Sequence, residues 1–155
     1  MKRTKGRMTI CWGLLVFLLI FIWGNSAMPA EMSSRFSDWV RDILLQVFPG
    51  NGENPGEGTH LLRKMAHFLE FACLGACLGW LHSMVNQKAV YALAWGTAAA
   101  CMDETIQHFS PGRAPGIRDV AIDTAGVAVG IGLLLTGYYL LRKRKNNLFL
   151  EENKI

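Results

Sequence analysis

Ionisable and amide side chains that could bind a metal ion or an anion gather in two stretches of an otherwise apolar sequence, residues 64–70 and 103–123. The complete set is Lys64, His67, Glu70, Asp103, Glu104, Gln107, Arg113, Asp119 and Asp123. The candidate metal ligands among them carry carboxylate or imidazole groups, and are His67, Glu70, Asp103, Glu104 and Asp123. Lys64 and Arg113 instead suit a phosphate or a carboxylate. These residue types predict a polar site with a divalent cation as its candidate cofactor, and they leave the metal's identity open.

Three roles fit this set of residues. With Arg63 and Arg118 added, the basic groups nearly balance the acidic ones, so an internal network of ion pairs with a structural role is one possibility. The second is a binding site without chemistry. The third is an enzyme site, with an acidic residue as general base and a metal ion or arginine stabilising charge. No serine or cysteine forms a recognisable nucleophile arrangement with a histidine, so enzymatic activity stays undecided.

Four apolar segments must position these residues, and their lengths predict membrane-spanning helices at about 8–28, 61–81, 89–109 and 119–141. An overall hydrophobic content of 51% also favours a membrane protein. The first segment follows basic residues and ends in small ones, so a cleaved signal peptide is the alternative to a retained helix. The sequence therefore predicts an all-α integral membrane bundle of four transmembrane helices in a single domain, residues 1–155.

The connecting segments are predicted from their own patterns. Residues 34–48 have apolar side chains at helical spacing opposite polar ones, which predicts an external amphipathic helix. This helix either packs over the bundle or lies in the membrane interface with Trp39 as an anchor. Residues 51–59 are rich in glycine and turn-forming pairs and are predicted to form a loop. Residues 142–155 follow the last apolar segment as a polar tail.

Basic residues cluster at both ends of the apolar region, from Lys2 to Arg7 and from Arg142 to Lys145. Such clusters favour the cytoplasmic side, so both termini are predicted to be cytoplasmic and the 142–155 tail with them. The polar residues of the second, third and fourth segments then fall in the outer half of the membrane. The basic clusters lack aromatic interleaving or a nucleic-acid motif, so membrane lipids rather than nucleic acid are their expected partners.

Small residues share helix faces with the polar groups. The glycines expected to pack helices together are Gly75, Gly79, Gly96, Gly126 and Gly130. Because small residues let helix backbones approach closely in a membrane, we expect the polar groups of the three helices to converge.

The spacing of these residues also resembles a known family. The pattern Lys64-x-x-His67-Phe68-x-Glu70, followed by Asp103-Glu104-x-x-Gln107 and by Pro111-Gly112-Arg113, continues as Asp119-x-x-x-Asp123-x-x-Gly126-x-x-x-Gly130. This pattern is similar to that of the VanZ-like family of small bacterial membrane proteins.

The resemblance implies a multi-pass protein of the bacterial cytoplasmic membrane with a role at the cell envelope, linked to resistance to the glycopeptide teicoplanin. It implies a lipid-linked cell-wall precursor or a glycopeptide as partner. If the protein is an enzyme, the resemblance implies a metal-dependent membrane enzyme that acts on such a precursor. It implies no settled reaction, and the oligomeric state stays open.

Overall fold

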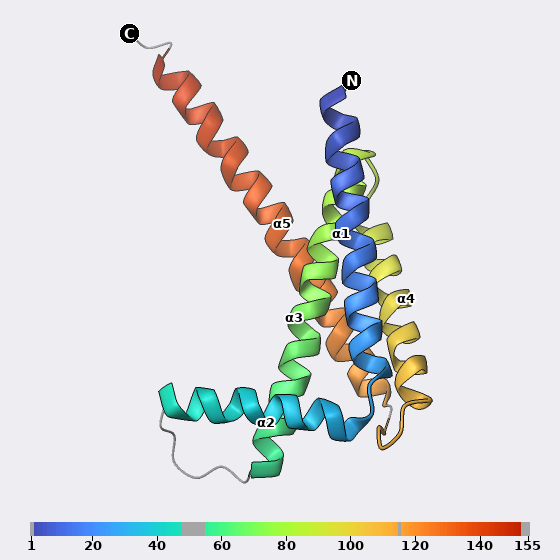
Figure 1. Ribbon diagram of the computed structural model, residues 1–155. Helices are drawn as coiled ribbons and strands as arrows, with labels where there is room; N and C mark the ends of the chain where they lie inside the picture. The colour runs from blue at the N-terminus through green and yellow to red at the C-terminus, as the bar shows by residue number, and fades with distance from the viewer. Residues whose placement is uncertain (1, 48–54, 115, 153–155) are drawn as a thin grey trace.

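The chain folds into helices only, within the residues that the computed structural model describes, which are 2–47, 55–114 and 116–152 (Figure 1). The helices are α1 (Lys2–Ala27), α2 (Ala30–Val47), α3 (Pro55–Met84), α4 (Ala89–His108) and α5 (Ile117–Glu152). The predicted all-α class is therefore confirmed.

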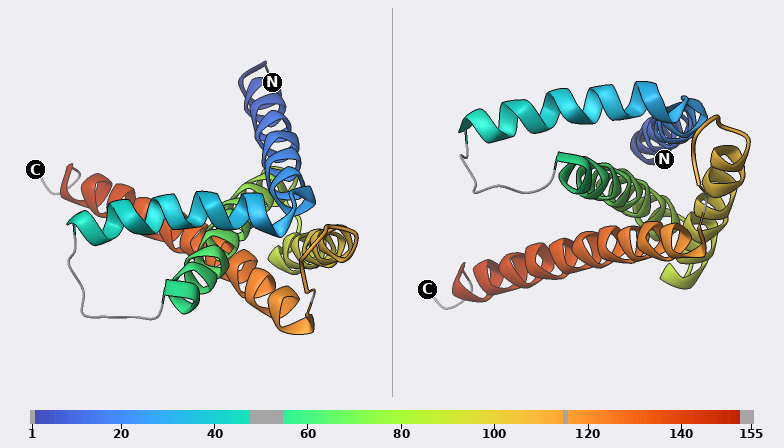
Figure 2. Two further views of the ribbon diagram at one scale, coloured as in Figure 1. Left: turned by 60° about the horizontal axis from the view of Figure 1, so that its bottom comes forward. Right: turned by 90° about the horizontal axis from the view of Figure 1, so that it is seen from below.

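Helices α1, α3 and α4 run side by side, and α5 packs chiefly against α3 (Figures 1 and 2). The amphipathic α2 lies across one end of this bundle, transverse to α1, α3 and α4. Helix α1 begins, and α5 ends, on the side away from α2. The end covered by α2 holds the last turn of α1, the last turn of α4 and the first turn of α5.

Two helices are long and apolar enough to cross a membrane, over Lys5–Ala27 in α1 and Ile117–Asn147 in α5. Helices α3 and α4 occupy the positions of the other two predicted spans, but they do not reach the same apolarity. The reason lies in the candidate site itself, because His67 and Glu70 in α3 and Asp103 and Glu104 in α4 lower the mean hydropathy of these helices. The structure thus supports two of the four predicted spans by length and composition.

Several element boundaries differ from the predictions, among them the start of α1, which is at Lys2 and not at about residue 8. Helix α3 begins at Pro55, inside the predicted loop, and residues 51–54 lie outside the described part of the chain. Proline is favoured in the first helical turn, where a missing N–H costs nothing. Helix α5 continues through the predicted polar tail to Glu152, because its lysine, arginine and leucine residues are good helix formers. The amphipathic helix begins at Ala30, before the predicted start at residue 34.

Close contact between α3 and α5 depends on glycine. A Cβ atom at Gly130 would collide with the carbonyl oxygen of Ala72, and one at Gly126 would meet the carbonyl oxygen of Phe68. On the α3 side, a Cβ at Gly75 would collide with the backbone of Val127. Gly96 of α4 faces the Val127 side chain, and Gly79 of α3 faces Leu134 and Ile131. The two backbones can pack this closely only because these side chains are absent.

Helix α1 is an integral part of the bundle. Its residues Cys11, Leu15 and Ile22 are buried, and Cys11 Sγ lies 3.7 Å from Cys77 Sγ of α3. Near the other end, the Trp23 indole donates a hydrogen bond of 3.4 Å to the Ala99 carbonyl of α4. These contacts bind α1 to both of its neighbours along most of its length.

Candidate functional site

Three helices bring one histidine and two aspartates together at the end of the bundle that α2 covers. A ring nitrogen of His67 in α3, a carboxylate oxygen of Asp103 in α4 and one of Asp123 in α5 all lie within 4.8 Å of one another. Asp103 is 0% exposed and Asp123 is 3% exposed. We call these three residues the HDD cluster.

The helix geometry explains why these residues meet. Asp119 and Asp123 are four residues apart on α5, and so are Asp103 and Gln107 on α4, so each pair lies on one helix face. Gly126, less than one turn after Asp123, lets α5 touch the backbone of α3 at Phe68. This close approach carries Asp123 to the neighbouring His67.

Three carboxylates in or near the cluster have one oxygen that accepts from a specific donor. Gln107 Nε2 donates to Asp103 Oδ2 over 2.7 Å, and Asn25 Nδ2 donates to Glu70 Oε1 over 3.1 Å. The backbone N–H of Gly116 donates to Glu104 Oε1. These bonds fix the orientation of the carboxylates.

The second ligand atom of these groups is buried without a hydrogen-bond partner among the described residues. The atoms concerned are Asp103 Oδ1, Glu70 Oε2, Glu104 Oε2 and His67 Nδ1. His67 Nδ1 and Glu70 Oε2 lie 3.8 Å apart, which is too long for a hydrogen bond. Because buried charges are normally paired or bound to metal, these atoms mark a place where a further ligand fits.

Ion pairing accounts for only part of the cluster's charge. Lys64 Nζ lies 3.0 Å from Asp119 Oδ1, and both side chains are about one-third exposed, at 32% and 31%. Among the side chains that the structure describes, no lysine or arginine makes such a pair with Glu70, Asp103, Glu104 or Asp123. The internal ion-pair network considered from the sequence is therefore limited, within these residues, to one pair at the rim.

A small cavity of about 20 Å³ adjoins the cluster, lined among others by Lys64, His67, Asp119 and Asp123. A space of this size holds about one water molecule or ion. Ligand atoms bound to one Zn²⁺-sized ion at about 2.1 Å can be at most about 4.2 Å apart, so a small side-chain adjustment would close the 4.8 Å cluster around a cation.

Glu70 and Glu104, which were also candidate metal ligands, do not belong to the three-residue cluster. Glu70 is held by Asn25 of α1, and Glu104 is held by the loop before α5. The geometry therefore brings three of the five candidates within 4.8 Å of one another and leaves the two glutamates outside this group.

Arg113 is attached to the end of α1. Its Nε donates to the Met28 carbonyl over 3.1 Å and its Nη2 to the Asn25 carbonyl over 2.8 Å. The last carbonyls of a helix lack partners and carry partial negative charge, so the end of α1 attracts the guanidinium. Burial lowers the pKa of Arg113, and the nearby Arg63 lowers it further.

Sequence reasoning missed the contribution of α1 to the site. Asn25 holds Glu70, the Ser26 carbonyl accepts a hydrogen bond of 2.8 Å from Ser110, and Ser26 Oγ lies 3.4 Å from Gln107 Nε2. The available signal was the pair of polar residues in the last turn of an apolar helix. These small residues were instead interpreted as a possible cleavage region.

The comparison with protein families gives one match. The model of the family described as VanZ/LLP1 matches residues 11–141, which include every residue of the candidate site. No curated protein and no solved structure matches the chain.

Proposed function

This chain belongs to the VanZ/LLP1 family, and we propose that it is a multi-pass protein of the bacterial cytoplasmic membrane whose outward-facing polar site binds a divalent cation. The observation that carries the proposal is the HDD cluster. His67, Asp103 and Asp123 are gathered from three helices, and the fully buried Asp103 retains an oxygen without a partner among the described residues. Two carboxylates and an imidazole are a ligand set that divalent transition metals bind.

Membrane insertion of all four long helices is part of the proposal. Helix α4 has 20 residues and α3 has 30, which correspond to about 30 Å and about 45 Å, enough to cross a hydrocarbon core of about 30 Å. Both helices also present large apolar side chains outward, including Leu69 of α3 and Val90 and Tyr91 of α4. Exposed apolar surface on this scale favours contact with lipid.

The orientation follows from the basic residues. Lys5 and Arg7 lie at the beginning of α1, and Arg142–Lys145 lie in the last part of α5, both away from α2. The positive-inside rule puts that side in the cytoplasm. The HDD cluster then faces the outer leaflet, and α2 lies in the outer interface with Trp39, which is 60% exposed, available to the lipid headgroups.

The proposed role of the cation is to hold an anionic group of an external ligand. Three protein ligands leave coordination positions open, and Lys64 at the rim supplies a further positive charge beside them. A lipid-linked cell-wall precursor or a glycopeptide presents such anionic groups, in keeping with the teicoplanin resistance that the family resemblance implies. Binding of this kind reduces the cell's sensitivity to teicoplanin.

The test compares teicoplanin susceptibility of cells that express the wild type, Asp103→Asn or Glu31→Gln. We expect the wild type to lower susceptibility and Asp103→Asn to lose the effect at an equal amount of protein in the membrane. Glu31→Gln removes a carboxylate from the exposed Glu31–Arg35 pair on α2 and should behave like the wild type. Equal protection by Asp103→Asn would contradict the proposed role of the site.

A second candidate is a metal-dependent enzyme acting on the same lipid-linked precursor. The open coordination positions favour it, because catalytic metal sites keep a place for water or substrate. Incubating the purified protein with a lipid-linked precursor and analysing the products by mass spectrometry separates the two. A new product that disappears with chelation identifies an enzyme, and an unchanged precursor identifies a binding protein.

A further inference from the structure

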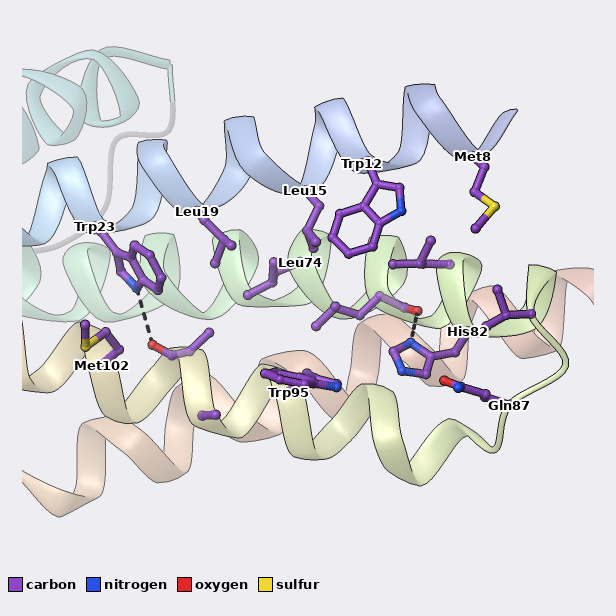
Figure 3. A pocket seen from close by; sticks show the side chains of 15 residues that line it. Met8, Trp12, Leu15, Leu19, Trp23, Leu74, His82, Gln87, Trp95 and Met102 are labelled. Carbon is purple, nitrogen blue, oxygen red and sulfur yellow. Dashed lines mark hydrogen bonds between the residues drawn. The ribbon is translucent and has the colours of Figure 1, made fainter. Parts of the chain in front are cut away.

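An apolar pocket of about 670 Å³ lies between α1, α3 and α4 (Figure 3). Its walls include Trp12 and Leu15 of α1, Leu74 of α3 and Trp95 of α4. This volume lies within the range of pockets that bind small molecules, which are also mostly apolar. None of the residues that line this pocket belongs to the candidate polar site.

The pocket is long and has two different ends. It extends along α1 from Met8 to Trp23, a rise of about 22 Å at 1.5 Å per residue. That is more than one leaflet of a hydrocarbon core about 30 Å thick. At the end nearer the polar site, the hydrogen bond from Trp23 to the Ala99 carbonyl bridges α1 and α4. At the other end, the polar side chains of His82 and Gln87 line the pocket (Figure 3).

Two basic residues, Arg7 and Lys88, are next in sequence to residues that line the pocket at its His82 and Gln87 end. Arg7 precedes the pocket residue Met8, and its guanidinium carbon lies 5.9 Å from the centre of the Trp80 ring. Lys88 follows Gln87 directly. The sequence contains no acidic residue in positions 1–30 or 71–102, the segments that line the pocket. The nearby basic residues and the lack of acidic ones therefore make this end of the pocket suitable for a negatively charged group.

We propose that this pocket holds an acyl chain of an anionic phospholipid from the cytoplasmic leaflet, with the phosphate at Arg7 and Lys88. An apolar space of this size offers water too few polar partners, whereas a lipid tail fills it with dispersion contacts. The inference rests on the proposed membrane orientation but not on the polar site. Loss of metal binding would leave it unchanged.

The test is native mass spectrometry of the detergent-solubilised protein with equal amounts of phosphatidylglycerol and phosphatidylcholine. Each basic residue near a membrane surface strengthens binding of anionic lipid by about fivefold, so the wild type should retain phosphatidylglycerol in clear preference. Arg7→Gln and Lys88→Gln should each reduce this preference by about that factor. Equal retention of the two lipids by the wild type would overturn the headgroup assignment.

Two matched substitutions test the location. Ala98 lines the pocket, and Ala98→Trp should place an indole inside it and reduce the retained lipid. Ala128 is exposed on α5 and does not line the pocket, so Ala128→Trp should retain phosphatidylglycerol as the wild type does. Equal retention by both variants would show that the lipid binds elsewhere.

A measurement on the wild type decides the location even if Ala98→Trp fails to fold. Trp12, Trp23 and Trp95 line the pocket. Phosphatidylglycerol with a brominated acyl chain, added as a minor component of phosphatidylcholine vesicles, should therefore quench tryptophan fluorescence more than brominated phosphatidylcholine at the same mole fraction. Equal quenching would overturn the proposal.

Discussion

Asp103 is the residue whose environment says most about the site. It is fully buried in α4, one oxygen accepts from Gln107, and the other has no partner among the described residues. A buried ionised carboxylate is costly unless a cation or several donors compensate it. With His67 and Asp123 beside it, the proposed cation would provide this compensation.

Arg113 stabilises the fold by holding the end of α1. Its two hydrogen bonds to the carbonyls of Asn25 and Met28 involve a charged donor, and removing such a group costs about 2 kcal/mol. Arg113→Ala should therefore lower the melting temperature in detergent by roughly 4–8 °C for a chain of this size.

The matched control is Arg35→Ala, which removes an arginine from an exposed pair, with both side chains 79% exposed. Exposed pairs of this type contribute at most about 1 kcal/mol, so its melting temperature should stay near that of the wild type. An unchanged melting temperature for Arg113→Ala would show that the arginine is not structural, and would favour direct contact with a ligand.

At the level of elements, the contact of α3 with α5 sets the position of Asp123. Gly130→Leu places a side chain against the Ala72 backbone, which cannot move aside as a flexible side chain would. We expect a loss of several kcal/mol, or no folded protein, since overpacking already costs about 1–3 kcal/mol where side chains can adjust.

Gly132→Ala provides the comparison for this substitution, because a Cβ at Gly132 would meet nothing within 4 Å. Its thermal stability in detergent should equal that of the wild type. If Gly130→Leu were equally stable, α3 and α5 would not pack as closely as the structure indicates.

Helix α1 is predicted to remain in the mature protein. It contributes Asn25 to the Glu70 hydrogen bond and Cys11 to the contact with Cys77, so removing it would leave both partners without their contacts. The intact mass of protein extracted from cell membranes should therefore include α1. A mass that corresponds to cleavage near Ala27 would identify a signal peptide instead.

The sequence predicted which helices form more accurately than the residues at which they begin and end. The length of apolar segments located four helices, and apolar residues at helical spacing located the amphipathic one. Neither pattern found the start of α3 at Pro55 or the extension of α5 to Glu152. Glycine-rich and charged segments carry no apolar pattern, so only local propensity and capping decide their conformation there.

The sequence predicted which polar residues share a helix face and that the polar faces of three helices converge, but it did not predict the individual contacts between helices. The spacing of Asp119 and Asp123, or of Asp103 and Gln107, defines a helix face without knowledge of the fold. The attachment of Arg113 to the end of α1 depends on where the connecting segments bring that end. No periodicity in the sequence contains this information.

For the whole molecule, the arrangement of helices predicts which loops face which side of the membrane. Gly116 lies between α4 and α5 at the polar end, and Gln87 lies between α3 and α4 at the opposite end. In a background lacking the four native cysteines, a single cysteine at position 116 should react with a membrane-impermeant thiol reagent added to intact cells. A cysteine at position 87 should react only after the cells are opened. The reverse pattern would invert the orientation and move the polar site to the cytoplasmic side.

The central claim is that His67, Asp103 and Asp123 bind a divalent cation, and metal analysis of the purified protein tests it most directly. Wild type, Asp103→Asn and Glu31→Gln would be purified in detergent without chelators, equilibrated with a series of divalent cations, freed of excess metal and analysed by elemental mass spectrometry. We predict close to one equivalent of a divalent metal in the wild type and in Glu31→Gln. For Asp103→Asn, the fraction of protein that holds metal should fall at least tenfold when the metal concentration is limiting, because a coordinating residue is removed. Equal metal content in the wild type and in a folded Asp103→Asn protein, or none in either, would contradict the claim.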